Sequence, residues 1–162
     1  MEPRPASTLN AIETEIIDLC VNGVRALGLP RSLGEIYGLI YSSVNPVSLD
    51  DLVERLQISK GSASQGLKFL RNLGAIKRVY VAGERRDHFV AEAELKKLVN
   101  GFLKEELEPH LESGQARLDR LDDLLVEMES GQKDFYQERV TRLRKWHERT
   151  GKILPLIRKF LG

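Results

Sequence analysis

The stretch from Ser48 to Phe89 constrains the fold most, because two short helical patterns and then an alternating pattern follow one another there. Ser48 is a suitable N-cap residue, and Asp51 stands three residues later, where a capping box needs its second side chain. The apolar residues that follow recur at helical spacing: Leu49, Leu52, Val53 and Leu56. This pattern predicts a short amphipathic helix.

A second helical pattern begins at Lys60, after a connection in which Ile58 can anchor the turn in the core and Ser59 can cap the helix. Gly74 follows it, where a left-handed residue commonly ends a helix. The apolar face consists of Ala63, Leu67, Leu70 and Leu73. The other face starts with short polar side chains and continues with cations: Lys60, Ser62, Ser64, Gln65, Lys68 and Arg71. Short polar side chains at the start of such a helix can contact base edges, and the cations on its flanks can contact phosphates.

After Gly74 the apolar period changes to two, which predicts a strand from Ile76 to about Val81. Residues 82–85 form the expected turn, and residues 86–90 the returning strand, so that Arg85 and Arg86 lie near the tip of a hairpin. Two arginines on a protruding hairpin can enter a neighbouring minor groove or contact its phosphates. Two helices, a tight connection and a basic hairpin together predict a winged helix.

Positive charge is concentrated on this module. Seven cations and two anions between Gln57 and Val90 give a net charge of +5, whereas the whole chain carries +1. The concentration favours nucleic acid, so we predict that the module binds double-stranded DNA. Two alternatives stay open: the cations are ordinary solvated side chains, or the winged helix is a protein–protein interaction module that binds DNA weakly or without sequence specificity.

Two runs of residues resemble GbsR-type regulators, a branch of the MarR-like winged-helix repressors. The run LGLPRSLGEIYGL at 27–39 looks like the signature that precedes their helix-turn-helix, and SKGSASQGL at 59–67 with GERRD at 83–87 is similar to their recognition helix and wing. The resemblance covers roughly residues 9–91 and continues more loosely beyond them. It implies a dimeric bacterial transcription regulator, typically a repressor, with a pocket for a small-molecule effector between the DNA-binding domain and the dimer helices.

The resemblance also implies aromatic residues around the effector, since one branch of the family is associated with choline-type cations held by aromatic side chains. The candidates for effector binding are Tyr37, Tyr41, Phe102, Tyr136 and Trp146. Packing in the core or in an interface is the alternative for each of them, because aromatic residues at helical spacing usually pack. The neighbours Trp146 and His147 are the pair to inspect first.

Ahead of the module, Ser32 and Glu35 predict a capping box that opens a helix through Tyr41, with Pro30 just outside it. Gly34 and Gly38 lie four residues apart on that helix, which predicts close approach of another helix. Gly61 and Gly66 in the second helix of the module allow close approach either to DNA or to a neighbour in the core.

An N-terminal helix is expected from about Leu9 to Leu27, with Ser7 or Thr8 as its cap and Gly28 as its stop. Cys20 on this helix is the only cysteine, so an internal disulfide or a cysteine-based zinc site is excluded. A buried structural thiol is the favoured interpretation of Cys20. A redox-sensing thiol or a disulfide across a dimer is the alternative.

The carboxyl-terminal half is expected to be nearly all helical, interrupted near Pro109 and turning at Gly131. One apolar stripe comprises Leu95, Leu98, Phe102, Leu107, Leu111, Leu118, Leu121, Leu125 and Met128. The last helix carries another, at Tyr136, Val140, Leu143, His147, Leu154, Ile157 and Leu161. Two long amphipathic helices with so few residues to cover them are expected to pair in a homodimer. A dimer would place two recognition helices about one DNA turn apart, as a pseudo-palindromic operator requires.

Other classes of protein have little support. The three histidines are scattered, no catalytic motif or phosphate-binding loop is present, and an acidic band over 105–129 is interpreted as a solvated helix face, so we expect neither an enzyme, a cofactor nor a metal site. No apolar run approaches the length of a membrane span, and residues 1–7 do not resemble a signal peptide, which favours a cytoplasmic protein without a membrane partner.

The sequence thus predicts a mainly α fold with a small β-hairpin wing. We expect an N-terminal helix over 1–29, a winged helix-turn-helix DNA-binding domain over 30–91, and a helical dimerisation and effector region over 92–162. The predicted function is sequence-specific, ligand-responsive repression of transcription. The expected DNA contacts are Ser59, Lys60, Ser62, Ser64, Gln65, Lys68, Arg71, Arg85 and Arg86.

Overall fold

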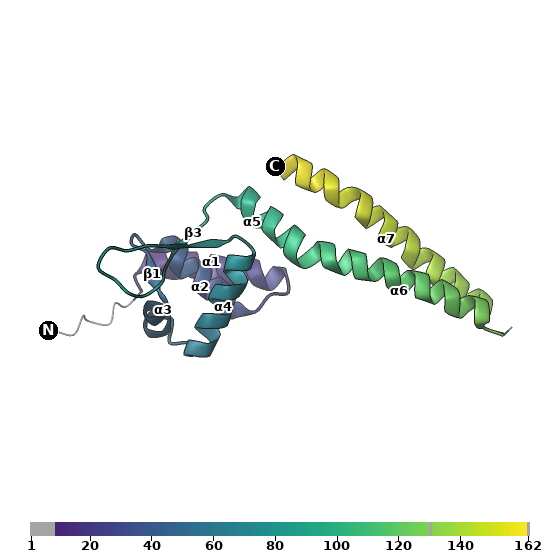
Figure 1. Cartoon of the computed structure of the whole chain (residues 1–162), viewed down its shortest axis with the longest axis horizontal. Coiled ribbons are helices and arrows are strands. Elements are labelled where there is room, and N and C mark those ends of the chain that lie inside the picture. Colours follow the sequence, from purple (N-terminus) through teal and green to yellow (C-terminus); the bar gives the residue numbers. More distant parts are fainter. Residues whose placement is uncertain (1–8, 130, 162) are drawn as a thin grey trace. The chain divides into compact units, whose positions relative to one another are not determined.

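The computed structural model describes residues 9–129 and 131–161 (Figure 1). These residues divide into two compact units, of which the first ends at Leu98 and the second begins at Val99. The helix α5 (Leu95–Phe102) spans the boundary between them. No described helix combines the length with the apolar character that crossing a bilayer requires.

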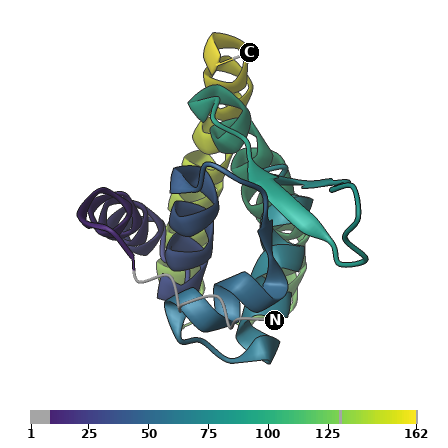
Figure 2. The same ribbon diagram turned by 90° about the vertical axis from the view of Figure 1, so that its left-hand side faces the viewer.

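The first unit is a winged helix built from four helices and a three-stranded antiparallel sheet. In chain order its elements are α1 (Ala11–Ala26), α2 (Arg31–Ser42), β1 (Val47–Ser48), α3 (Leu49–Leu56), α4 (Lys60–Asn72), β2 (Ile76–Val79) and β3 (His88–Ala91). The strand order is β1-β3-β2, and the loop between β2 and β3 projects from the rest of this unit as the wing (Figure 2). The predicted mainly helical fold with a β-hairpin wing is confirmed.

Local capping and turn signals explain the helix-turn-helix. Ser48 and Asp51 form the predicted capping box, and Ser59 caps α4 by accepting a hydrogen bond from the Ser62 N–H at 3.1 Å. Gln57 adopts the left-handed conformation between the two helices, and Gly74 does so after α4, as predicted. The structure adds the short strand β1, which the sequence did not reveal and which pairs with β3.

The core lies between α1, α2, α3, α4 and the sheet. Ile36, Leu39 and Leu52 are fully buried at its centre, and the predicted apolar face of α4 is buried as well. Gly34 and Gly38 of α2 face the backbone of α1, where a Cβ on Gly34 would come within 2.5 Å of the Val21 Cα. The prediction that these two glycines allow a close helix contact is confirmed.

Several local predictions need correction. The helix α2 has no capping box, because Pro30 is its N-cap, Ser32 lies in its first turn, and Glu35 pairs with Arg31 at 2.8 Å. The cap of α1 is Asn10, which forms a capping box with Glu13, whereas Ser7 and Thr8 lie outside the described residues.

The third correction concerns the wing, where β3 begins at His88 rather than at residue 86. The ladder between β2 and β3 ends at the pair Val79 and His88, so Arg86 and Asp87 belong to the projecting loop. Cys20 also differs from the favoured interpretation, since it is half-buried rather than fully buried. Burial raises the pKa of its thiol.

The second unit contains a π-helical turn (Leu103–Leu107) and the long helices α6 (Glu108–Glu127) and α7 (Lys133–Leu161). The π turn comes just before Pro109, where the regular α-helical pattern was expected to be interrupted. Gly131 lies in the turn between α6 and α7, as predicted. Arg144 of α7 contacts Asp119 at 3.2 Å and Asp122 at 2.5 Å, so part of the acidic band pairs with α7.

Only a few side chains along the α6–α7 pair are buried, namely Leu118, Leu125, Val140 and Leu154. The His147 ring packs against Gly114, where a Cβ would lie 2.9 Å from its Cε1 atom. Many large apolar side chains of these two helices are instead exposed, including Leu124, Val126, Leu143, Trp146, Ile153, Leu156 and Phe160. The predicted stripe on α7 is partly covered within the described residues: Val140 and Leu154 are buried, whereas Tyr136, Leu143 and Ile157 are exposed.

Candidate nucleic-acid interface

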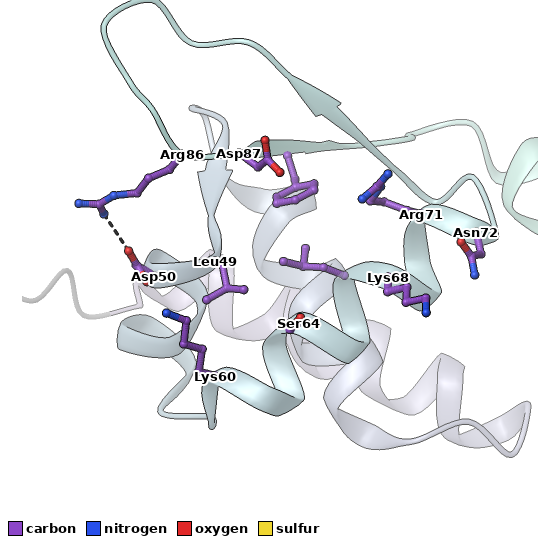
Figure 3. A pocket seen from close by; sticks show the side chains of 11 residues that line it. Leu49, Asp50, Lys60, Ser64, Lys68, Arg71, Asn72, Arg86 and Asp87 are labelled. Carbon is purple, nitrogen blue, oxygen red and sulfur yellow. Dashed lines mark ion pairs between the residues drawn. The ribbon is translucent and has the colours of Figure 1, made fainter.

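The exposed face of α4 borders an open groove of about 640 Å³ in the first unit (Figure 3). The start of α3 and the wing with the adjoining strand β3 supply the rest of its lining. The lining residues are Leu49, Asp50, Lys60, Ser64, Leu67, Lys68, Arg71, Asn72, Arg86, Asp87 and Phe89. Leu67 and Phe89 are buried and Leu49 is half-buried, whereas the other eight lining residues, all polar or charged, are exposed.

Helical periodicity explains why α4 presents this surface. Ala63, Leu67 and Leu70 are buried in the core, which turns the intervening residues toward the groove and solvent. Gly66 belongs to the buried side, because a Cβ there would lie 2.3 Å from the Ile36 Cδ1. At Gly61 a Cβ would meet only the Ser59 Oγ, at an ordinary contact distance of 3.9 Å. Of the two alternatives for these glycines, core packing therefore applies to Gly66.

The structure brings five of the nine predicted DNA-contacting residues together around the groove, namely Lys60, Ser64, Lys68, Arg71 and Arg86. The other four are exposed but do not line it. Ser59 and Ser62 lie at the start of α4, with their hydroxyl groups 2.9 Å apart, and Gln65 lies on the exposed side of the same helix. Arg85 belongs to the projecting loop of the wing.

The groove is positively charged but contains two carboxylates. Lys60, Lys68, Arg71 and Arg86 contribute cations, while Asp50 and Asp87 contribute anions. Arg86 Nη1 lies 3.0 Å from Asp50 Oδ2, and Asp87 lies 3.4 Å from Arg78 on the neighbouring strand β2. The excess of cations creates a surface that can attract phosphate groups.

Sequence reasoning missed Asp50, Asp87 and Asn72 as members of this site. Asn72 carried a weak signal, because it follows Lys68 by one helical turn on the exposed side of α4. Asp50 carried none, since only the tertiary packing of the wing against the start of α3 places its carboxylate beside Arg86.

The five effector candidates fall into two groups. On α2, the rings of Tyr37 and Tyr41 are 5.8 Å apart, and the Tyr37 hydroxyl donates a 2.6 Å hydrogen bond to the Glu92 carbonyl. Burial, with smaller contributions from Cys20, Tyr41 and Glu92, raises the pKa of Tyr37 to about 12. This hydroxyl is thus already used within the first unit.

The remaining effector candidates lie beyond the first unit. Phe102 is half-buried at the end of α5, Tyr136 packs edge-on against Phe135 at 5.5 Å, and Trp146 is 67% exposed. Trp146 and His147 differ, because His147 faces Gly114 while Trp146 is open to solvent. No group of three or more potential metal-ligating side chains is present among the described residues.

In a comparison with known proteins, the chain matches no family model. The HTH-type transcriptional repressor GbsR of Bacillus subtilis (strain 168) is 36% identical over 87 residues, which are 54% of this chain and 48% of GbsR. The HTH-type transcriptional repressor OpcR of the same organism is 26% identical over 80 residues, which are 49% of this chain and 43% of OpcR. The chain spans about half the length of these two relatives.

A crystal structure of a transcriptional regulator superposes with a TM-score of 0.59 and 24% identity, covering 93% of this chain and 95% of that one. This similarity confirms the fold. The resemblance to GbsR-type regulators is confirmed over the matched part of the chain. The homologues are transcriptional regulators rather than enzymes, in agreement with the prediction that the chain is not an enzyme.

Proposed function

We propose that this protein is a sequence-specific DNA-binding regulator of transcription, and that it acts as a dimeric repressor. The observation that carries the proposal is the groove, in which four cations and a serine from α4 and the wing face one open surface. The names of GbsR and OpcR, both repressors, support the choice of repression over activation. In this proposal residues 30–91 form the DNA-binding domain, and residues 92–162 supply dimerisation and effector response.

In the proposed complex, α4 enters the major groove. Ser59, Ser62, Ser64 and Gln65 offer short hydrogen-bonding groups to base edges, since they lie on the exposed side of the first two turns. Lys60, Lys68 and Arg71 neutralise phosphates on either side. The wing then places Arg85 and Arg86 at the backbone or minor groove next to it.

The exposed apolar surface of α6 and α7 supports the proposed dimerisation. Leu124, Leu143, Trp146 and Leu156 retain between 51% and 67% of their exposure, which is costly for a chain in water. A second copy would cover such side chains and bring a second α4 to the DNA. A pseudo-palindromic operator with half-sites about one turn apart is the matching target.

Response to a small-molecule effector is the third part of the proposal. The Tyr37–Tyr41 pair on α2 supplies two neighbouring rings, and Phe102, Tyr136 and Trp146 supply further aromatic surface in the chain. A choline-type cation is the ligand class that the family resemblance implies for such rings. Titration of the protein–DNA complex with choline would test for release of the DNA, and unchanged binding would contradict a response to this ligand class.

The DNA-binding proposal is tested by measuring affinity for duplex DNA with Lys68→Ala and Arg71→Ala. Each variant removes one cation from the groove, so binding should weaken and the slope of log affinity against log salt should become shallower by about 0.9 per lost phosphate contact. Lys96→Ala is the matched control, because Lys96 is an exposed cation of α5 that does not line the groove. Equal behaviour of the groove variants and the control would contradict the proposal.

A further inference from the structure

Asp50 is one of two acidic residues in the wall of a groove whose other charged residues are cations. It is the second residue of α3, and its side chain points across the groove toward the wing (Figure 3). Its Oδ2 atom lies 3.0 Å from Arg86 Nη1, while the two side chains keep 54% and 64% of their exposure. The pair is therefore open to solvent and to any molecule that enters the groove.

The helix α3 does not need Asp50 for its cap. Asp51 performs that role, because its Oδ2 atom accepts hydrogen bonds from the Ser48 N–H at 2.8 Å and from the Ser48 hydroxyl at 2.6 Å. Asp50 stabilises α3 only through the favourable interaction of its negative charge with the helix dipole in the first turn. Its carboxylate is thus positioned for Arg86 rather than for the backbone of α3.

An arginine binds carboxylate and phosphate oxygens in the same geometry, so the two ligands compete for one guanidinium. We propose that Asp50 competes with DNA phosphates for Arg86: it holds Arg86 in the DNA-free protein and thereby weakens binding to duplex DNA of any sequence. This inference rests on the proposed DNA-binding function. Arg86 must leave Asp50 before it contacts a phosphate. Binding to any duplex therefore includes the free-energy cost of breaking this ion pair.

The cost is the same for every duplex, so it lowers the affinity for an operator and for arbitrary DNA by the same factor. It matters most for arbitrary DNA, because those complexes are weak to begin with. Nonspecific complexes depend almost entirely on phosphate contacts, whereas an operator complex adds contacts to base edges. Exposed ion pairs are weak, so the expected penalty is about two- to fivefold in affinity for each wing. A modest penalty suits a regulator that must leave arbitrary DNA to search for its operator.

The test compares Asp50→Asn with wild-type protein on a duplex of arbitrary sequence over a range of salt concentrations. The variant should bind two- to fivefold more tightly per wing, with a steeper salt dependence, because Arg86 is released for phosphate. Glu54→Gln is the control, since it removes one exposed carboxylate from the same helix outside the groove. Thermal unfolding of each variant verifies that α3 is retained.

A double-mutant cycle with Arg86→Ala separates competition from simple repulsion between Asp50 and DNA. Competition predicts that Asp50→Asn has little effect once Arg86 is absent. An equal gain in affinity with and without Arg86 would overturn the inference in favour of direct repulsion. A loss of affinity in Asp50→Asn would overturn it as well, because Asp50 would then hold Arg86 in a productive position.

These outcomes are distinct from failure of the proposed function. If wild-type protein and all variants bind no duplex at low salt, the DNA-binding proposal and this inference both fall. If wild-type protein binds duplex DNA but Asp50→Asn behaves like Glu54→Gln, only the role of Asp50 is overturned.

Discussion

Glu13 of α1 and Arg55 of α3 form an ion pair, with Oε1 and Nη2 2.7 Å apart and only 11% and 15% of the respective side chains exposed. The second carboxylate oxygen of Glu13 accepts a hydrogen bond from the Asn10 N–H at 2.9 Å and so completes the capping box of α1. One side chain therefore ties the start of α1 to the first helix of the helix-turn-helix. The stability of the first unit should depend on its charge.

Glu13→Gln should destabilise the protein by about 2 kcal/mol at neutral pH, because it removes the negative charge that faces the Arg55 guanidinium in a nearly buried position. Burial alone would raise the pKa of Glu13, but hydrogen bonds from Arg55 and Asn10, together with the Arg55 charge, hold it below its usual value. Such a group contributes stability above its unfolded-state pKa of about 4.3, and the contribution is lost as the pH falls through the folded-state pKa. The difference in unfolding free energy between wild type and Glu13→Gln should therefore become smaller in acid. Urea unfolding at several pH values measures this difference. If it stayed constant from neutral pH into acid, the role of the Glu13 charge would be refuted.

Gly34→Ala should destabilise the first unit by about 3 kcal/mol, because the added methyl group meets backbone rather than a movable side chain. The nearest atom, the Val21 Cα, would be only 2.5 Å away. Gly23→Ala on α1 is the control, since it has nothing within 4 Å and should gain about 0.5 to 1 kcal/mol from its better helix propensity. Thermal unfolding of both variants checks the contrast. Similar melting temperatures would show that α1 and α2 can separate at little cost.

The loss of stability caused by Gly66→Ala should be partly reversed by shortening the neighbouring side chain of Ile36. The new methyl group would lie 2.3 Å from the Ile36 Cδ1, an atom that Ile36→Val removes. Each single substitution is expected to cost roughly 1 kcal/mol or more. The double variant should lose less stability than the two single variants lose together, by more than about 0.5 kcal/mol. Strict additivity in chemical denaturation would mean that Gly66 is needed for another reason, such as contact with DNA.

Replacement of both Arg85 and Arg86 by alanine should weaken binding to all DNA sequences alike. These side chains belong to the projecting wing loop, so the account assigns them phosphate or minor-groove contacts that do not depend on base identity in the major groove. The salt slope should become shallower by roughly two for each protomer. Fluorescence anisotropy with two unrelated duplexes provides the measurement. Unchanged affinity in a folded double variant would contradict the wing assignment.

Gln65→Ala should instead change base preference at one position of each half-site. A good bidentate contact from this amide would discriminate between bases by roughly 1 to 3 kcal/mol. Affinity for a panel of single-base operator variants would reveal the loss of discrimination at that position. An equal loss on every sequence would argue that Gln65 positions the helix instead of contacting a base.

Most of the winged helix could be predicted because its signals are local. Ser48, Ser59 and Gly74 set the ends of α3 and α4, and the apolar spacing of α4 defines its buried face without reference to other elements. The basic side chains on the opposite face follow directly. Gly34 and Gly38 likewise indicated a close helix contact, although the sequence could not say that α1 is the partner.

The errors arose where two local signals competed or where pairing is long-range. Ser32 and Glu35 match the spacing of a capping box, but Pro30 with φ of −60° already occupies the N-cap position of α2. Asn10 and Glu13 have the same spacing and were the usable signal for α1. The strand β1 is two residues long, so only its pairing with Phe89 and His88 identifies it. The Asp50–Arg86 contact depends on that same tertiary arrangement.

Sequence-specific recognition of DNA by a dimer can be measured by selecting bound duplexes from a random pool at two salt concentrations. We expect enrichment of an inverted repeat with half-sites about one helical turn apart, and its retention at the higher salt. Recovery of no motif, with binding that vanishes as salt rises, would contradict the proposal and would favour a winged helix that docks another protein.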